Sequence, residues 1–326
     1  MDRILVTGGG GFIGSHLAKY LYERGHFVRT ADIKYDDYVQ GKYCTERAKL
    51  DLRDYKNCRE VTAGIDKVYN LAANMGGIGF ISSVFADVMY DNVLINTHMI
   101  KASVENKVKR FFFSSSACIY PNYKQTMSEV PPLKEDDAYP ADPNEAYGWE
   151  KLFTEEMIKA FQSDYKFEGR VARFHNIYGP EGTYKGGREK APAALCRKVA
   201  EASDPGTIEI WGDGTATRSF CYVDDCVRGI VALMESGYNK PLNIGSDRLI
   251  SVEALADMVI KASGKKISKT HNLSAPVGVQ GRNADLTLVK KTLGWEPQVS
   301  LEDGMARTYK WIKEMLEKDK KQMGKK

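Results

Sequence analysis

Metal-binding and disulfide patterns are missing from this sequence. Its 326 residues include six cysteines and five histidines. No two cysteines form a CxxC pair, and the histidines do not have the spacing of metal ligands. Neither a zinc site nor a disulfide framework is therefore predicted, and we expect no bound metal.

Long hydrophobic runs and a large excess of one charge are also missing. Residues 68–86 form the longest uncharged stretch near membrane length, but two asparagines, two serines and three glycines make them too polar to cross a bilayer. The 47 basic and 43 acidic residues leave a formal charge of +4, so nucleic acid is not a predicted partner. Because only two residues precede the first strand-like run, we expect no signal peptide and a cytoplasmic protein with reduced thiols.

The sequence does contain a regular alternation of strand-like and helix-like segments. Residues 3–7, RILVT, are followed by GGGGFIG and then by a helix-periodic segment that ends at Gly25. Further strand-like runs, separated by helical stretches, lie at 26–32, 67–73, 109–116 and 169–175. This order predicts an α/β protein with a doubly wound parallel Rossmann sheet and helices on both faces.

The pattern changes after about residue 180, where glycine-rich loops, isolated strand-like pieces and separate helices appear. We interpret this part as a smaller mixed α/β C-terminal substrate domain over the carboxyl end of the sheet, where doubly wound folds bind ligands. The predicted divisions are a dinucleotide-binding domain at 1–180, to which some later segments return, a substrate domain at 181–318, and a disordered basic tail at 319–326.

A glycine motif lies where the first strand meets the first helix. Gly8, Gly11 and Gly14 allow a tight turn whose backbone approaches a pyrophosphate, and the helix that starts there offers free N–H groups to the anion. The alternative is a glycine turn without a ligand. Asp32, at the end of the second strand, suits the adenosine ribose and would repel a 2′-phosphate, which favours NAD over NADP. Asp51 is a secondary candidate near the adenine, with a helix N-cap as the equal alternative.

Tyr147 and Lys151, in AYGWEK, lie four residues apart and share one face of a predicted helix. A lysine ammonium and a positively charged nicotinamide favour the phenolate, which would bring a tyrosine with a free pKa near ~10 into range as a base. Together with Ser116 at the end of a strand, this order resembles the extended short-chain dehydrogenase/reductase family over residues 3 to about 318. The resemblance implies a Ser–Tyr–Lys site that moves a hydride between a sugar-nucleotide carbon and NAD. The cofactor-binding candidates are then Gly8, Gly11, Phe12, Ile13, Gly14, Asp32, Asp51, Tyr147 and Lys151.

Cys118 follows Ser116 by two residues, so both side chains share one side of the strand if the extended geometry persists. A thiol with a free pKa of ~8.5, lowered by nearby cations, is suited to deprotonating a sugar carbon. A buried packing role is the alternative. Basic residues downstream cluster where a nucleotide diphosphate would need them, although each alone could be a solvated surface charge. They are Arg188, Lys190, Lys198 and Arg218.

Longer strings resemble the family of GDP-mannose 3,5-epimerases. They are AANMGGIGFI at 72–81, SSACIYP at 115–121, and the segments 174–194, 211–220, 243–247 and 279–283. The resemblance implies epimerisation of GDP-mannose and related GDP-hexoses through a 4-keto intermediate with transient reduction of bound NAD. The implied products are GDP-L-galactose after inversion at C3 and C5, and GDP-L-gulose after inversion at C5 alone.

The same resemblance assigns roles to individual residues. It implies that Cys118 and Lys190 form the acid/base pair and that Ser116, Tyr147 and Lys151 serve the redox step. The implied substrate-binding residues are Gly76, Ser116, Ala117, Cys118, Asn176, Glu189, Lys190, Ala191, Lys198, Arg218 and Arg282.

Other interpretations stay open at this point. A 4,6-dehydratase would need an acidic residue near the serine, whereas positions 117–120 are Ala, Cys, Ile and Tyr. A 4-epimerase would leave Cys118 and Lys190 without a role. A non-catalytic NAD-binding scaffold is disfavoured because Ser116, Tyr147 and Lys151 are all present. Apolar stripes on more than one face of the helices near 88–106 and 147–164 predict a homodimer through a four-helix bundle.

Overall fold

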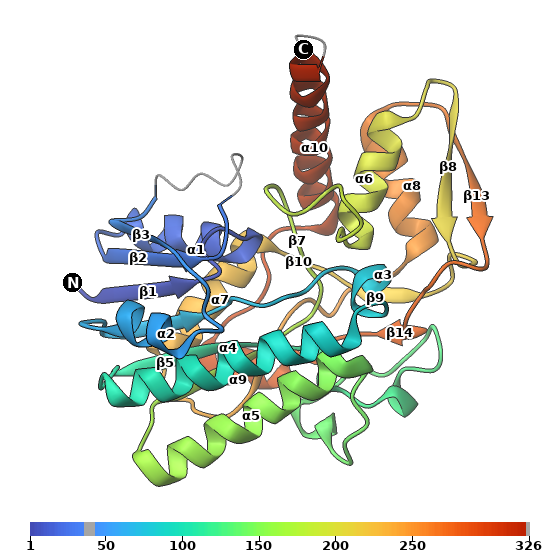
Figure 1. Cartoon of the computed structure of the whole chain (residues 1–326). Helices are drawn as coiled ribbons and strands as arrows, with labels where there is room; N and C mark the ends of the chain where they lie inside the picture. The colour runs from blue at the N-terminus through green and yellow to red at the C-terminus, as the bar shows by residue number, and fades with distance from the viewer. Residues whose placement is uncertain (36–42, 324–326) are drawn as a thin grey trace.

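The computed structural model describes residues 1–35 and 43–323, and its centre is a parallel seven-stranded sheet (Figure 1). The strand order across the sheet is β11-β6-β5-β4-β1-β2-β3, with every neighbouring pair parallel. The prediction of a doubly wound Rossmann sheet is confirmed. Its strands are β1 (Arg3–Thr7), β2 (Phe27–Asp32), β3 (Glu46–Lys49), β4 (Lys67–Asn70), β5 (Arg110–Ser116), β6 (Gly169–Phe174) and β11 (Leu242–Ile244).

The sheet is covered on both faces because its strands are apolar on both sides. In β5, Phe111 and Phe113 point to one face and Phe112 points to the other, as the two-residue period of a strand requires. One face packs against the helices α2 (Tyr55–Thr62), α4 (Phe85–Glu105) and α5 (Glu145–Tyr165). The other face packs against α1 (Phe12–Tyr22) and α7 (Val223–Glu235). Figure 1 shows α4 and α5 side by side along the first face.

The later part of the chain forms a lobe beyond the carboxyl ends of the strands (Figure 1). Its helices are α6 (Ala191–Glu201), α8 (Val252–Ser263) and α10 (Leu301–Met323). Its strands form three small sheets: β7 (Ile177–Tyr178) with β10 (Cys221–Tyr222); β8 (Gly206–Trp211) with β13 (Ile267–Asn272); and β9 (Thr217–Ser219) between β12 (Leu249–Ser251) and β14 (Gly281–Arg282). Three late elements lie with the first domain, since β11 pairs with β6, α7 packs against α1, and α9 (Thr287–Leu293) packs against β11.

Short helices complete the segments that approach the carboxyl end of β5. They are α3 (Ile78–Ile81) and the 3₁₀ turns η1 (Ala117–Ile119), η2 (Asn122–Lys124) and η3 (Glu135–Ala138). Within the described residues, no helix has both the length and the apolar content needed to cross a membrane.

The predicted disordered tail is wrong for residues 319–323, because α10 continues as a helix to Met323. The Asp319 carboxylate accepts hydrogen bonds from the Tyr184 hydroxyl at 3.0 Å and from Lys185 Nζ at 2.5 Å. The ring of Tyr184 packs edge-on against Trp311 of the same helix, at 5.5 Å between ring centroids. These contacts hold α10 against the loop before Lys190. The lysine-rich composition of the segment did not reveal them, because the partners are distant in sequence. Residues 324–326 lie outside the described residues.

Candidate active site

The glycine turn between β1 and α1 has the geometry that a dinucleotide pyrophosphate requires. Gly8 has a φ of +69°, and a Cβ on Gly14 would collide with the backbone carbonyl of Gly8. Gly11 is the N-cap of α1 and provides no side-chain cap, so the first N–H groups of the helix stay available to an anion. The residues present therefore fit the pyrophosphate of NAD. Phe12 and Ile13 begin the helix and pack against the core.

The two predicted adenosine ligands, Asp32 and Asp51, differ in the partners of their carboxylates. Asp32 ends β2, and its carboxylate accepts from the backbone N–H groups of Gly10 at 2.9 Å and Lys34 at 3.1 Å. Burial raises the pKa of Asp32, and these backbone hydrogen bonds oppose that rise. Asp51 instead pairs with Arg53 at 2.6 Å. The N-cap of α2 is Asp54, so the capping alternative for Asp51 is wrong.

The Ser–Tyr–Lys residues meet at the carboxyl end of β5. Ser116 is the last residue of β5, and its Oγ accepts from the backbone N–H of Cys118 at 3.1 Å. Tyr147 and Lys151 lie on one face of α5, with Lys151 Nζ 5.4 Å from the centre of the Tyr147 ring and 4.8 Å from that of Phe113. Both side chains are buried. The helical spacing thus produces the predicted pairing of phenol and ammonium.

The surroundings of Tyr147 in the protein act against its ionisation. Burial raises the pKa of Tyr147 well above 10, the negative charges of Glu150 and Cys118 raise it further, and the hydrogen bond with Ser116 lowers it. Glu150, the residue directly before Lys151, is fully buried and is the second cause of the raised pKa after the burial of the phenol itself.

Cys118 lies on η1, and Arg282 of β14 donates to its sulfur from Nη1 at 3.3 Å. Burial opposes ionisation of the Cys118 thiol, but Arg282, the hydrogen bond with Ser116, and Lys190 outweigh it and lower the pKa. Arg282 is held by its Nε, which donates to Gln125 at 2.5 Å, whereas its buried Nη2 has no protein partner. A cation with one unpartnered donor thus borders a thiol that ionises readily.

Lys190 lies at the N-cap of α6 and reaches the same space from the second domain. The residue as a whole is exposed, yet the protein around its ammonium lowers the pKa of Lys190, as does Arg282, while Cys118 opposes the shift. The neighbouring Glu189 is turned away, since it accepts from Arg197 and from the backbone of Gly187. The prediction that Glu189 contacts a substrate has no support from this orientation.

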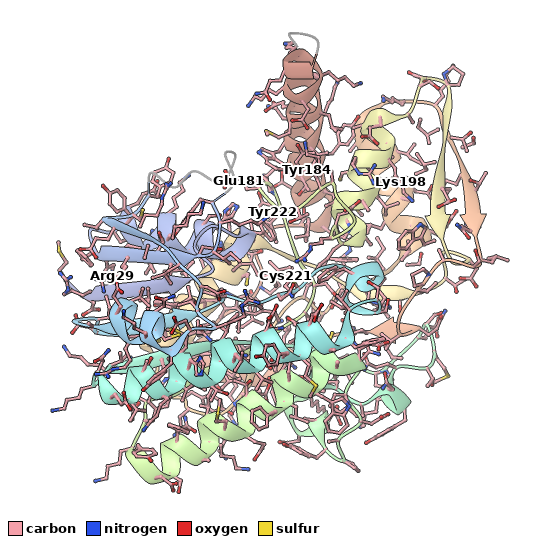
Figure 2. The ribbon with its side chains drawn as sticks, viewed as in Figure 1. Arg29, Glu181, Tyr184, Lys198, Cys221 and Tyr222 are labelled. Carbon is pink, nitrogen blue, oxygen red and sulfur yellow. The ribbon has the colours of Figure 1, made fainter. Side chains whose placement is uncertain are left out.

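Two further predicted substrate ligands are the cations Arg218 and Lys198, of which only Lys198 has a carboxylate nearby among the described residues, that of Glu209 at 4.0 Å. Arg218 of β9 donates to the backbone carbonyls of Thr217 at 2.7 Å and Val279 at 2.5 Å. Burial and the neighbouring Arg282 lower the pKa of Arg218. A pair of guanidinium groups with no salt bridge suits an anionic group such as a diphosphate. Lys198 lies on α6, as Figure 2 shows, and donates to the carbonyl of Glu209 at 2.6 Å.

The remaining predicted substrate-binding residues have short or uncharged side chains. Asn176 has a φ of +47°, and its amide donates to the Ser219 carbonyl at 2.9 Å, so in this structure it links the connection between β6 and β7 to β9. Gly76 is buried beside Phe80. Ala117 belongs to η1 and Ala191 begins α6, next to Cys118 and Lys190 respectively.

Sequence reasoning missed several residues that shape this site. Gly77 allows the closest approach of two loops: its N–H donates to the Arg188 carbonyl at 2.9 Å, and a Cβ there would collide with the Glu189 backbone. The pair of glycines in MGGIGF is the signal that could have found it. Gln125 and Glu150 carry no such local signal, because their partners are distant in sequence.

A Rossmann domain with a serine, tyrosine and lysine at the carboxyl end of β5 defines a short-chain dehydrogenase/reductase type of protein. Residues 4–245 match the sequence profile of the NAD dependent epimerase/dehydratase family, and the chain belongs to this family. It is 50% identical to GDP-mannose 3,5-epimerase 1 of Oryza sativa subsp. japonica, over 98% of this chain and 84% of that relative.

Solved structures agree with the fold. A UDP-glucose 4-epimerase from Thermotoga maritima, with UDP-glucose, has a TM-score of 0.88 at 28% identity, over 96% of this chain and 99% of that one. A UDP-glucuronic acid 4-epimerase from Bacillus cereus, in complex with UDP-glucuronic acid and NAD, has a TM-score of 0.83 at 27% identity, with the same coverage.

Proposed function

We propose that this protein epimerises GDP-mannose at C3 and C5 to GDP-L-galactose, and at C5 alone to GDP-L-gulose, with NAD as cofactor. The observation that carries the proposal is the environment of Cys118: its thiol follows Ser116, accepts from Arg282 and is coupled electrostatically to Lys190. A reaction confined to C4 has no use for this second acid/base pair. The 50% identity to a GDP-mannose 3,5-epimerase supports the choice of substrate.

The redox part of the reaction prepares the carbon acids. NAD, when bound at the glycine turn, supplies the hydride acceptor and donor for C4. Oxidation at C4 gives a ketone, which acidifies the hydrogens on C3 and C5. Tyr147 accepts the proton of the C4 hydroxyl as a phenolate that Lys151 stabilises, and it returns that proton from the neutral phenol when the ketone is reduced.

The acid/base part uses groups from both domains. Cys118 comes from the carboxyl end of β5, and Lys190 comes from the start of α6. The lowered pKa of Cys118 favours a thiolate that removes the proton next to the ketone. The lowered pKa of Lys190 makes its ammonium a readier proton donor for the re-protonation. Arg218 and Arg282 supply positive charge for the anionic part of the substrate.

The test is hydrogen exchange in heavy water. The protein is incubated with NAD and GDP-mannose, and deuterium is located by NMR. We expect deuterium at C3 and C5 of the sugar with the wild type and none with Cys118→Ser, while the control Cys44→Ser exchanges at the wild-type rate.

Each alternative function has its own outcome in this experiment. Inversion at C4 without exchange at C3 or C5 would identify a 4-epimerase, and loss of water across C5–C6 would identify a 4,6-dehydratase. No exchange at all with NAD present would favour a non-catalytic scaffold.

We also propose a homodimer that forms through α4 and α5. These helices pack against each other, and each exposes an apolar pair at i, i+4 spacing: Phe85 and Met89 on α4, and Trp149 and Phe153 on α5. A second copy placed on this face would complete a four-helix bundle. Sedimentation should give a dimer for the wild type and for Leu273→Glu, a distant exposed control, and a monomer for Phe153→Glu. A wild-type monomer at micromolar concentration would contradict the proposal.

The cytoplasm is the proposed compartment. Cys58, Cys118, Cys196, Cys221 and Cys226 carry free thiols, as expected of a reducing environment. Cell fractionation with a specific antibody tests this proposal, and recovery outside the cytoplasmic fraction would exclude it.

A further inference from the structure

Glu150 is a fully buried carboxylate beside the redox pair, and the proposed mechanism gives it no role. Glu150 lies on α5, one residue before Lys151, and its Oε1 lies 3.6 Å from Lys151 Nζ. Asn92 Nδ2 donates to Oε1 at 3.0 Å, and Asn96 Nδ2 donates to Oε2 at 3.2 Å. A buried carboxylate is costly unless it is paired, so this arrangement needs an explanation.

Backbone groups fix the direction of the hydrogen bond from Asn96. Thr7 Oγ1 accepts from the N–H groups of Leu71 at 3.0 Å and Ala72 at 3.1 Å, so its own hydrogen is directed to Asn70 Oδ1 at 2.8 Å. Asn70 Nδ2 then donates to Asn96 Oδ1 at 2.9 Å. The Asn96 amide nitrogen is therefore the group that faces Glu150.

The direction at Asn92 is fixed in the same way. Asn92 Oδ1 accepts from the backbone N–H of Asn74 at 2.6 Å, so its Nδ2 is left to donate to Glu150. Both carboxylate oxygens thus meet only donors: two amides and the Lys151 ammonium. A carboxylic acid would direct a hydrogen at one of these donors, so the geometry requires the ionised form. Burial raises the pKa of Glu150, and Lys151, Asn92 and Asn96 oppose that rise.

The hydrogen bonds that start at Glu150 join three parts of the site: the redox pair, the glycine turn and the loop before Lys190. Through Asn96 and Asn70 they reach the carboxyl ends of β1 and β4, next to the glycine turn. Through Asn92 they reach Asn74, whose Oδ1 accepts from Arg188 at 3.1 Å on the loop that leads to Lys190. The carboxylate of Glu150 is held rigidly at this junction, because Asn92 and Asn96 are themselves hydrogen-bonded to other groups.

We propose that Glu150 is a positioning residue for the redox pair: it fixes the Lys151 ammonium beside the Tyr147 ring and offsets its charge. The inference rests on the proposed function, in which Tyr147 accepts a proton during oxidation at C4 and returns it during reduction. Both protonation states of Tyr147 must then be accessible within one cycle. Lys151 alone would hold the phenolate too strongly, and Glu150 balances it.

The charges around Tyr147 agree with this role. On α5 they are Glu150 and Lys151, and on η1 the neighbour is Cys118. Ser116 of β5 hydrogen-bonds to the phenol. Burial is the first cause of the raised pKa of Tyr147, and Glu150 is the second. Arg282 of β14 and Lys190 at the start of α6 do not act on Tyr147 directly, but both lower the pKa of its neighbour Cys118.

The test is a titration of Tyr147 in the protein without nucleotide. Tyrosine is labelled isotopically, and the ring-carbon NMR signal of Tyr147 is assigned by its loss in Tyr147→Phe. We expect Glu150→Gln to increase the acid dissociation constant of Tyr147 roughly tenfold or more, ~1.4 kcal/mol. The matched control is Glu155→Gln, an equally buried carboxylate on α5 that pairs with Arg173 instead and should leave the titration unchanged. An unchanged or smaller dissociation constant in Glu150→Gln would overturn the inference.

Two further measurements distinguish a failure of the Glu150 inference from misfolding of the variant and from a failure of the proposed function. The carboxyl-carbon signal of Glu150 in labelled wild-type protein reports its charge even if Glu150→Gln does not fold, and a protonated Glu150 at neutral pH would overturn the inference. The pH profile of GDP-mannose turnover should shift to lower pH in Glu150→Gln, whereas a purely structural role would lower the rate equally at all pH values. Absence of turnover by the wild type would refute the proposed function, and the titration without nucleotide would still decide the role of Glu150.

Discussion

Replacing Arg282 with glutamine tests whether this guanidinium makes Cys118 a base. Arg282 Nη1 lies 3.3 Å from the sulfur. At this separation and an effective dielectric constant of about 20, a unit ion pair is worth roughly 5 kcal/mol before desolvation. Cys118 is partly open to solvent, so screening and desolvation reduce this to about 1.4–2.7 kcal/mol, one to two powers of ten in thiolate population.

The assay is the rate of alkylation by iodoacetamide as a function of pH, followed by mass spectrometry, with Cys118→Ser as the blank. The lowered pKa of Cys118 in the wild type means that its alkylation rate rises at a lower pH than for an ordinary thiol. Arg282→Gln should move this rise to higher pH and slow the reaction at neutral pH about 10- to 100-fold. The buried cysteines Cys58, Cys196 and Cys221 have raised pKa values and should react slowly in both proteins.

Arg218→Gln is the matched control, because Arg218 is a nearby cation that donates to carbonyls and not to the sulfur. It should change the alkylation profile much less than Arg282→Gln does. An identical profile in wild type and Arg282→Gln would refute the electrostatic explanation of Cys118 reactivity, whatever the effect on catalysis.

Three further predictions concern binding and stability. Gly14→Ala should abolish the NAD-dependent rise in melting temperature, because the new methyl group collides with the Gly8 carbonyl. Glu155→Gln should destabilise the fold by ~3–5 kcal/mol in urea unfolding, since it leaves the buried Arg173 guanidinium without its 2.7 Å carboxylate partner. Burial lowers the pKa of His175 from 6.5 to about 3, so the unfolded chain takes up the proton first and stability falls as pH drops below 6.5. Between pH 7 and about 4.5 this should cost roughly 2–3 kcal/mol that His175→Gln does not lose.

Control variants show whether each predicted effect belongs to the replaced residue. Gly237→Ala adds a methyl group where no atom lies within 4 Å, and should retain the NAD response. Glu156→Gln removes a half-exposed carboxylate next to Glu155 and should change stability by less than about 1 kcal/mol. Equal losses in Glu155→Gln and Glu156→Gln, or equal pH dependence in wild type and His175→Gln, would contradict the corresponding burial arguments.

Local patterns predicted the parts of the site that depend on neighbouring residues. Gly8 and Gly14 are needed by one turn, and Tyr147 and Lys151 share a face because four residues make about one helical turn. The prediction for the acidity of Tyr147 considered Lys151 and the nicotinamide, but it left out the burial of the phenol and the charge of Glu150, which both raise the pKa. A glutamate next to a lysine usually indicates a solvated face, and nothing in AYGWEK shows that α4 covers this one.

The sequence by itself determined the sheet class, the cofactor turn and the identity of the reactive side chains, since strand and helix periodicity and glycine conformations act over a few residues. Only the tertiary structure decided their chemical state. Arg282 meets Cys118 across 164 residues of chain, and Asn92 meets Glu150 across 58. Charge interactions and desolvation depend on distance in space, which packing sets, so the ionisation of the thiol and of the phenol belongs to the folded molecule.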